Sequence, residues 1–372
     1  MSNKVSRITA VIKRGRLTEI VHALKVAGVQ HMHSAAGRAP VLQERKGILA
    51  VLGSDTDLAS DPVDVLTFMV DQEREDQIIA LISEVGRLQL PGMGSVFSEE
   101  VTLIESHNLC GKNTNIDQNF FAKPENLYSE LMGISCIVQR GQGDAIARVI
   151  LESGACVPTV MYGDGTGVRD KLGLLRITIP AEKEVINLVL SSYDAEAVME
   201  LMITAGKLDQ PGKGFIYVFS VRQGIINNQI TRGQSGQAAS MEQIISALDG
   251  IKGGMEWRRR GGAEASSRNF LRGLVDLNLV CDEGRADTLV TAAMNSGASG
   301  ATIAKTRYIS PQGVDTEGDH VSPARQVCNM IVGEGQVQGI VEAISGAGGF
   351  DDKTHGQIIT YPVPRAFTYT GG

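Results

Sequence analysis

The feature that most constrains the fold is an interval between glycines that occurs three times. The members of each pair are 13 residues apart: Gly15 and Gly28, Gly141 and Gly154, and Gly284 and Gly297. This interval accommodates a turn and one short helix that ends at a glycine in the left-handed conformation. Similar strand and helix patterns follow each pair, which indicates three copies of one unit.

The first copy shows the expected order of elements. Residues 5–12 alternate like a strand, and residues 17–27 carry the apolar stripe of a helix. Further elements are expected in the order strand, strand, helix and strand at 29–34, 63–70, 73–85 and 95–101. This β-α-β-β-α-β order is that of a ferredoxin-like unit, which has one antiparallel sheet with both helices on one face.

Three such units would each leave one sheet face bare. Because a unit of this size buries only a modest core, we expect the bare faces to pack against one another. The sequence therefore predicts an α+β fold in which three tandem ferredoxin-like (βαββαβ) repeats form an intrachain pseudo-trimer. The expected boundaries are repeats at 1–103, 130–223 and 272–368, joined by linkers at 104–129 and 224–271.

Composition and charge narrow the class of protein. The net charge of −7 argues against nucleic acid as a partner. No apolar run approaches the about 20 residues that span a bilayer, and the N-terminus does not have the pattern of a signal peptide. The five cysteines show no Cys-x-x-Cys spacing, which indicates free thiols in a reducing compartment. We therefore expect a cytoplasmic protein that is not embedded in a membrane.

A glycine- and lysine-rich loop carries a resemblance to a known family. Residues 206–221 read GKLDQPGKGFIYVFSV, and weaker copies lie at 86–101 and 346–363. The loop resembles the end of the nitrogen-regulatory PII signalling proteins, in which a glycine-and-lysine loop joins the second helix to the last strand. Gly206, Lys207, Gly212 and Lys213 match that loop, so the three copies are interpreted as PII-like repeats.

The resemblance implies a function. PII proteins are homotrimers that bind adenine nucleotide between neighbouring units and contact enzymes or transporters through a long loop. By resemblance, this chain is a regulatory protein and not an enzyme. It is expected to act as a monomeric pseudo-trimer that senses a small anionic effector, with ATP, ADP or another nucleotide favoured, and to control a protein partner.

The expected effector site is built around the glycine-rich loops. Backbone N–H groups in such a turn can surround phosphate oxygens, and a nearby lysine adds positive charge. The candidate ligand-binding residues are Gly206, Lys207, Gly212, Lys213, Gly214, Lys353, His355, Gly356, Arg222 and Arg365. The alternative is that these glycines only make tight turns between helix and strand.

The partner is expected to contact the excursion between the second and third strands of the second repeat. Its candidate residues are Gly163, Gly165, Arg169 and Lys171. None of the three excursions has the tyrosine-bearing tip that some PII proteins modify, so uridylylation is not expected.

Two other functions stay open at the level of sequence. The chain can be a non-catalytic scaffold whose ligand sites have decayed, because the first loop has no lysine. It can also bind a metal, as the copper-tolerance CutA proteins of similar architecture do, because His31 and His33 share one face of a strand. We favour ordinary hydrogen-bonded histidines and predict no metal. The basic run at Trp257–Arg260 is interpreted as a solvated linker.

Overall fold

The structure is a computed structural model. It describes residues 4–44, 56–107, 127–167, 181–227, 229–232, 248, 251, 268–309 and 322–370. Among these residues, no helix is long and apolar enough to cross a membrane.

The described elements follow one another in a recurring order. The first group is β1 (Lys4–Lys13), α1 (Leu17–Val26), β2 (Met32–Glu44), β3 (Thr56–Val70), α2 (Glu75–Gly86) and β4 (Gly94–Ser106). The second is β5 (Leu131–Gln139), α3 (Gly143–Glu152), β6 (Thr159–Gly167), β7 (Glu182–Ser191), α4 (Ala195–Gly206) and β8 (Gly214–Val221). The third is β11 (Leu274–Asp282), α7 (Ala286–Asn295), β12 (Gly300–Ile309), β13 (Ala324–Gly333), α8 (Val337–Gly346) and β14 (Gln357–Val363). The short strands β9 (Gln223–Ile225), β10 (Thr231–Arg232) and β15 (Arg365–Thr368) lie outside these groups.

The predicted fold class is wrong in its central point. The described strands do not form three small ferredoxin-like sheets. They join into one mixed sheet of 15 strands in which β4 pairs with β14, β12 with β6, and β15 with β8. β2 closes the arrangement by pairing with both β12 and β6. The physical reason is that the edge strands of a small sheet leave backbone N–H and C=O groups unpaired, and pairing across the groups satisfies them.

The last strand of each group, or the short strand that follows it, pairs with the last strand of another group. The end of β4 pairs with β14, with Thr102 opposite Thr360. β9, which follows β8, returns to β4, with Gly224 opposite Phe97. β15, which follows β14, pairs with β8, with Ala366 opposite Tyr217. This cyclic exchange makes the sheet continuous. The predicted repeat and linker boundaries stay a prediction.

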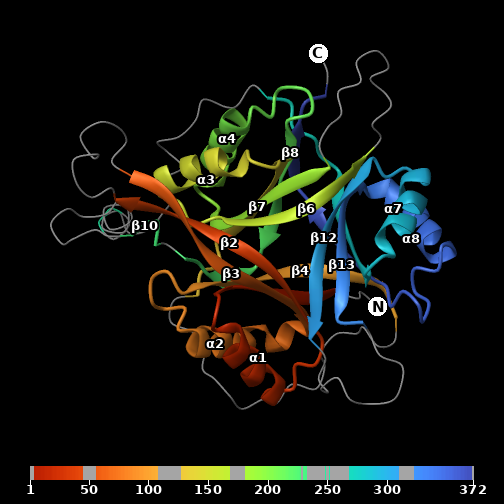
Figure 1. Ribbon diagram of the computed structural model, residues 1–372, viewed down its shortest axis with the longest axis horizontal. Helices are drawn as coiled ribbons and strands as arrows, with labels where there is room; N and C mark the ends of the chain where they lie inside the picture. The colour runs from red at the N-terminus through yellow and green to blue at the C-terminus, as the bar shows by residue number, and fades with distance from the viewer. Residues whose placement is uncertain are drawn as a thin grey trace.

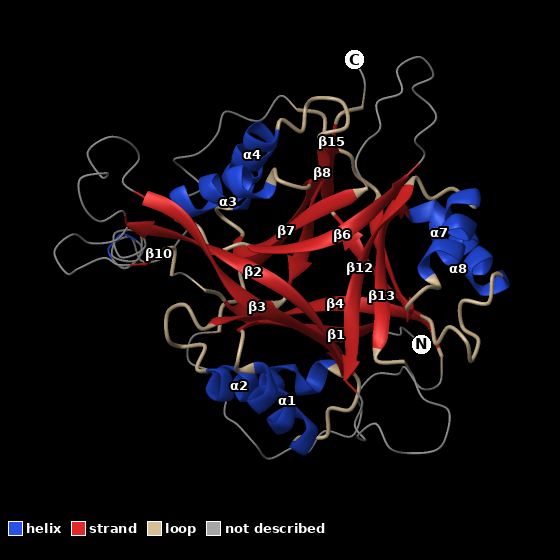
Figure 2. Cartoon of the chain, in the orientation of Figure 1, coloured by secondary structure: helices blue, strands red, loops and turns tan. Residues whose placement is uncertain are grey.

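The helices lie outside the strands. Figures 1 and 2 show the pairs α1 and α2, α3 and α4, and α7 and α8 at three places around strands that fill the middle of the molecule. Apolar side chains fill the space between each pair and its strands, as Ile20, Leu24 and Ile79 do in the first group. A further apolar cluster lies among the inward-facing side chains and includes Phe97 and Phe219.

Alternation along the first strand of each group positions the candidate site. On β1, Ile8, Ala10 and Ile12 belong to the core beneath the helices. Because successive side chains point to opposite faces of a strand, Arg7 and Thr9 face the interior. The corresponding strands β5 and β11 direct side chains to the same interior.

Candidate functional site

A cavity of about 240 Å³ lies among the inward faces of strands from all three groups. Polar side chains line its wall at one position along the strands. We call six of these side chains the polar belt: Thr9, Thr67, Ser135, Asn187, Asn278 and Asn329.

The polar belt consists of three cross-strand pairs. Thr9 lies opposite Thr67 on β1 and β3. Ser135 lies opposite Asn187 on β5 and β7, and Asn278 lies opposite Asn329 on β11 and β13. Each group of strands therefore contributes one hydroxyl or amide pair at the same register.

Several polar groups of the belt lack a protein partner. Within the described ranges, no hydrogen bond joins the side chain of Thr9, Thr67 or Asn278 to another residue. The amide of Asn187 reaches only the sulfur of Met161, at 3.9 Å. Polar groups inside proteins are almost always hydrogen-bonded to protein, water or ligand. The belt is therefore suited to contact molecules in the cavity.

Charged residues at one end of the cavity neutralise each other. Arg7 donates two hydrogen bonds to the Glu99 carboxylate, Nε to Oε2 at 2.9 Å and Nη2 to Oε1 at 2.7 Å. Burial by itself lowers the pKa of Arg7, but the charges and hydrogen bonds of Glu99 and Tyr361 together outweigh it, so the pKa is raised. The guanidinium therefore stays charged, and it is paired with the Glu99 carboxylate.

A second buried cluster lies beside this ion pair. The hydroxyls of Tyr217 and Tyr361 donate to Oδ2 of Asp276, at 2.8 Å and 2.6 Å. Burial raises the pKa of Asp276, and it also raises the pKa of both tyrosines. The guanidinium of Arg7 lies over the Tyr361 ring, with its central carbon 4.5 Å from the ring centroid. The tyrosines thus stay protonated, and both line the cavity.

Two histidines and a tyrosine complete the polar part of the wall. Nδ1 of His31 lies 2.6 Å from the hydroxyl of Tyr308. Burial lowers the pKa of His33 to about 3, and the charges of Arg325 and His31 contribute. Its Nε2 is buried and has no hydrogen-bond partner among the described residues. No group of three His, Cys, Asp or Glu in the described part of the chain could hold a metal ion.

The structure brings one set of predicted site residues together in a single turn. Gly206 ends α4, Lys207 follows in the left-handed conformation with φ of 52°, and Gly212 has φ of 70°. The carbonyl of Gly212 accepts a hydrogen bond from Gln139 Nε2 at 3.0 Å. Lys213 is half-buried, and Gly214 begins β8.

The first group has the same turn without the lysine. Arg87 repeats the left-handed conformation of Lys207, with φ of 54°, and Gly92 repeats that of Gly212. Met93 occupies the place of Lys213. The backbone geometry of the turn therefore does not depend on a phosphate-binding lysine. The role of the 206–214 turn in ligand binding stays a prediction.

Predicted residues of the third loop also lie in one turn, but its histidine is engaged. His355 Nδ1 lies 2.7 Å from Asp282 Oδ2, and the His355 carbonyl accepts a hydrogen bond from Arg325 at 2.7 Å. Lys353 is exposed, and a side chain on buried Gly356 would collide with the carbonyl of Gly349. The loop holds His355 against a carboxylate, which disfavours an anion there.

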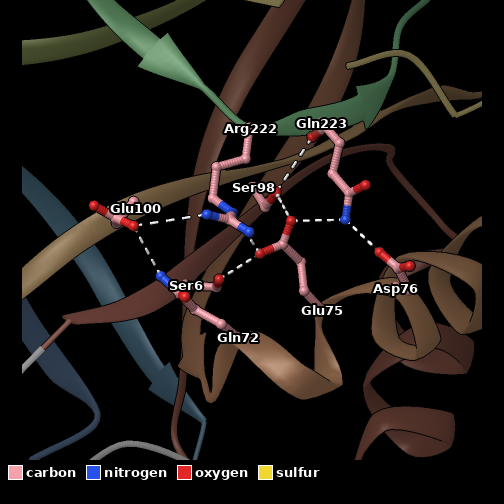
Figure 3. Close-up of polar contacts among 8 residues, drawn as sticks. All are labelled: Ser6, Gln72, Glu75, Asp76, Ser98, Glu100, Arg222 and Gln223. Carbon is pink, nitrogen blue, oxygen red and sulfur yellow. Dashed lines mark hydrogen bonds and ion pairs between the residues drawn. The ribbon is translucent and has the colours of Figure 1, made fainter.

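Arg222 lies at the exposed side of a polar cluster around the buried carboxylate of Glu75 (Figure 3). Its Nε donates to Glu75 Oε2 at 3.1 Å. Ser98 and Gln223 donate to Glu75 Oε1 at 2.6 Å and 2.7 Å, and Ser6 donates to Oε2. Arg222 therefore fastens the end of β8 to the first group and is not a free cation.

Arg365 and the predicted partner loop have other positions. Arg365 lies 3.2 Å from the Glu196 carboxylate and over the ring of Phe270. Gly163 and Gly165 lie on β6, where a side chain on Gly163 would come within 2.9 Å of the Ile303 carbonyl on β12. Gly163 therefore allows the close approach of β6 and β12, whereas a side chain on Gly165 would meet the Lys183 side chain on β7. Arg169, Lys171 and Trp257–Arg260 lie outside the described residues.

The polar belt is the part of the site that the sequence analysis missed. A signal was present, because Thr9, Ser135 and Asn278 each stand six residues before the first glycine of their pair. Each interrupts a strand that is otherwise mostly apolar.

The comparisons with known proteins identify no family for this chain. No protein-family model matches the chain, and no curated protein matches it. Among solved structures, an anthrone oxidase-like protein is similar with 10% sequence identity and a TM-score of 0.18. The match covers 66% of this chain and 97% of that chain. Such a score shows neither a family nor a fold. The description as tandem nitrogen-regulatory PII repeats is contradicted by the continuous sheet and has no support from these comparisons.

Proposed function

We propose that the protein is a small-molecule binding protein whose ligand occupies the central cavity. The observation that carries this proposal is the polar belt, in which hydroxyl and amide groups from three parts of the chain face one cavity, and Thr9, Thr67 and Asn278 have no side-chain hydrogen bond to another described residue. A ligand that bridges these groups would connect all three groups of strands. Its binding would therefore stabilise the whole sheet.

Size and charge narrow the ligand class. An apolar cavity of about 150 Å³ holds benzene, so 240 Å³ corresponds to about ten non-hydrogen atoms. The charged groups at the cavity end are already paired, Arg7 with Glu99 and Asp276 with two tyrosines. Burying an additional unpaired charge is costly, so the proposed ligand is neutral.

The same pairing supports a binding role over a catalytic one. The candidate acids and bases of the cavity end hold one another in fixed hydrogen bonds. Binding then serves regulation, in which occupancy changes the stability of β2, β6 and β12, whose side chains also line the cavity. Control of a protein partner through the segments that follow these strands belongs to this proposal.

Mass spectrometry of the gently purified protein tests the proposal. We expect a small neutral molecule to be released on denaturation and to raise the melting temperature when it is added back. Ala304→Leu, which places a larger side chain in the cavity wall, should reduce both signals. Ala324→Leu, at an exposed position on the neighbouring strand, is the matched control. Absence of a released molecule, with equal behaviour of the two variants, contradicts the proposal.

A nucleotide effector at the 206–214 turn is a separate proposal. It rests on the lysine and glycines of that turn and not on the cavity. Titration calorimetry with ATP and ADP, on the unmodified chain and on Lys213→Ala, tests it. Absence of binding by both nucleotides rules out this site and leaves the cavity proposal intact.

A further inference from the structure

We infer that the ligand of the cavity is a neutral heteroaromatic ring of nucleobase size, held at its edge by asparagine amides. The inference rests on the proposed binding function and names the ligand class. It is carried by the kind and placement of the polar side chains, by the aromatic wall and by the volume.

Three of the asparagines that line the cavity belong to the polar belt, and two of these three are cross-strand neighbours. Asn278 and Asn329 lie directly opposite on β11 and β13, so their Cβ atoms are about 5 Å apart. A carboxamide presents a donor and an acceptor in one plane. That pair matches the donor and acceptor edge of a nucleobase, which asparagine commonly binds with two hydrogen bonds.

The side-chain amides of these asparagines have hydrogen-bonding groups left for a ligand. Asn278 makes no side-chain hydrogen bond to another described residue. Asn329 Nδ2 is directed at Asp276, with 3.4 Å to each carboxylate oxygen, so its own oxygen faces away from that carboxylate. Asn187 adds a third amide from another part of the sheet. Together they supply both donors and acceptors, which suits a ring that carries both.

Aromatic rings supply the second element of recognition. Tyr217, Phe219 and Tyr361 line the same cavity. The ring centroids of Tyr217 and Phe219 are 6.5 Å apart, and those of Phe219 and Tyr361 are 6.2 Å apart. Stacking on such rings is available to every flat base, whatever its edge. An aliphatic molecule of equal volume gains no such contact.

Volume and charge favour a free base over a nucleotide in this cavity. Space for about ten non-hydrogen atoms holds a purine base but not its ribose and phosphates. Arg7, which could otherwise hold a phosphate, is neutralised by Glu99 at 2.7 Å. The inferred ligand is therefore a free base, chemically distinct from the anionic effector expected at the glycine-rich turns.

Calorimetry and thermal denaturation with defined probes test this inference. The probes are adenine and hypoxanthine, naphthalene as a flat ring system of the same size without a polar edge, and camphor as a compact non-aromatic molecule. We expect adenine or hypoxanthine to bind and naphthalene to bind at least about tenfold more weakly, because it has no hydrogen-bond donor or acceptor for the amides. Asn278→Leu should weaken base binding by about tenfold or more. Asn295→Leu, at an exposed asparagine that ends α7, is the matched control.

Each outcome has a distinct meaning. Camphor binding without base binding overturns the inference and leaves the proposed function standing. Failure of every probe, with no molecule released from the purified protein, overturns both. Base binding that is unchanged in both Asn278→Leu and Asn187→Leu shows that the amides do not recognise the ring. Asn278→Ser serves as a second variant if Asn278→Leu does not fold.

Discussion

The Glu75 cluster and the polar belt are both buried and polar, yet they are built in opposite ways. Glu75 is 1% exposed and accepts hydrogen bonds from Ser6, Ser98, Arg222 and Gln223 (Figure 3). The polar belt lines a cavity, and several of its groups have no protein partner. The first arrangement uses polarity to join two parts of the chain. The second leaves polarity available to another molecule.

The difference follows from where the two regions lie. The Glu75 cluster forms where the chain leaves β8 and pairs as β9 with β4, so donors from both parts converge on one carboxylate. The belt lies where the strands surround a cavity, and there side chains from different groups face open space. A satisfied cluster therefore indicates a structural role, and an unsatisfied one indicates a binding role.

The largest expected effect is the loss of Arg222. Arg222→Ala leaves the Glu75 side chain, only 2% exposed, without its cation. Because the Arg222 side chain is itself 41% exposed, water can replace part of the interaction, and we expect the free energy of unfolding to fall by about 2 to 3 kcal/mol. Arg365→Ala is the control, because its partner Glu196 is 54% exposed and such pairs contribute about 1 kcal/mol or less. Urea denaturation measures both. Equal losses would show that the Glu75 cluster is not the stronger connection.

The second-largest expected effect is a loss of stability at acidic pH that is caused by His33. In the unfolded chain a histidine titrates near 6.5, whereas burial, with Arg325 and His31, lowers the pKa of folded His33 to about 3. The unfolded state alone takes up this proton as the pH falls below 6.5. The stability that His33 contributes at neutral pH is therefore lost toward pH 3, by at most about 1.4 kcal/mol per pH unit.

His33→Asn should remove this part of the acid sensitivity. Urea denaturation at about pH 7 and about pH 5 should show a smaller loss of stability on acidification in the variant than in the unmodified protein. His22→Asn, at an exposed position of α1, is the control. Equal slopes in the unmodified chain and in His33→Asn would place His33 in contact with water.

A smaller effect of opposite sign is expected for Asp276. Burial raises the pKa of Asp276 above 3.8, although hydrogen bonds from Tyr361 and Tyr217 oppose the shift. The folded state therefore holds this proton to higher pH than the unfolded state does. The contribution of the group to stability is present below the unfolded pKa and declines as the pH rises through the folded pKa.

Comparison with Asp276→Asn isolates this contribution. The stability of the unmodified protein relative to Asp276→Asn should fall as the pH rises from the acidic range toward neutrality. Parallel stability curves for the two proteins across that range would mean that Asp276 is charged in the fold at every pH tested.

The sequence predicted local elements better than their assembly. The helix expected at 17–27 is α1, because Ile20 and Leu24 recur at the helical period and Gly28 has the left-handed φ of 94°. Pairing between β4 and β14 could not be predicted in the same way. It is made by backbone groups that every residue carries, so the side-chain pattern holds no record of which edges meet.

The candidate site was harder to predict from the sequence than the assembly of the strands. Arg222 and Arg365 were predicted as ligand residues because each follows a last strand, but position along the chain does not reveal a carboxylate partner. Glu75 is 147 residues from Arg222 and Glu196 is 169 residues from Arg365. The belt residue Thr9 is an ordinary strand residue until the cavity beside it is known.

The smallest expected effect is that of Thr9→Val, and it tests the difference between the polar belt and the Glu75 cluster most directly. Thr9→Val removes a hydroxyl that has no hydrogen-bond partner among the described residues and keeps the shape of the side chain. Stability should therefore change by less than about 0.5 kcal/mol. Ser98→Ala removes a hydroxyl that donates to the Glu75 carboxylate at 2.6 Å, and should cost about 2 kcal/mol. If Thr9→Val costs as much as Ser98→Ala, the Thr9 hydroxyl has a structural role, and the distinction between the two regions fails at this residue. If it costs little but weakens binding of the molecule released from the cavity, the unpaired hydroxyl belongs to the ligand site.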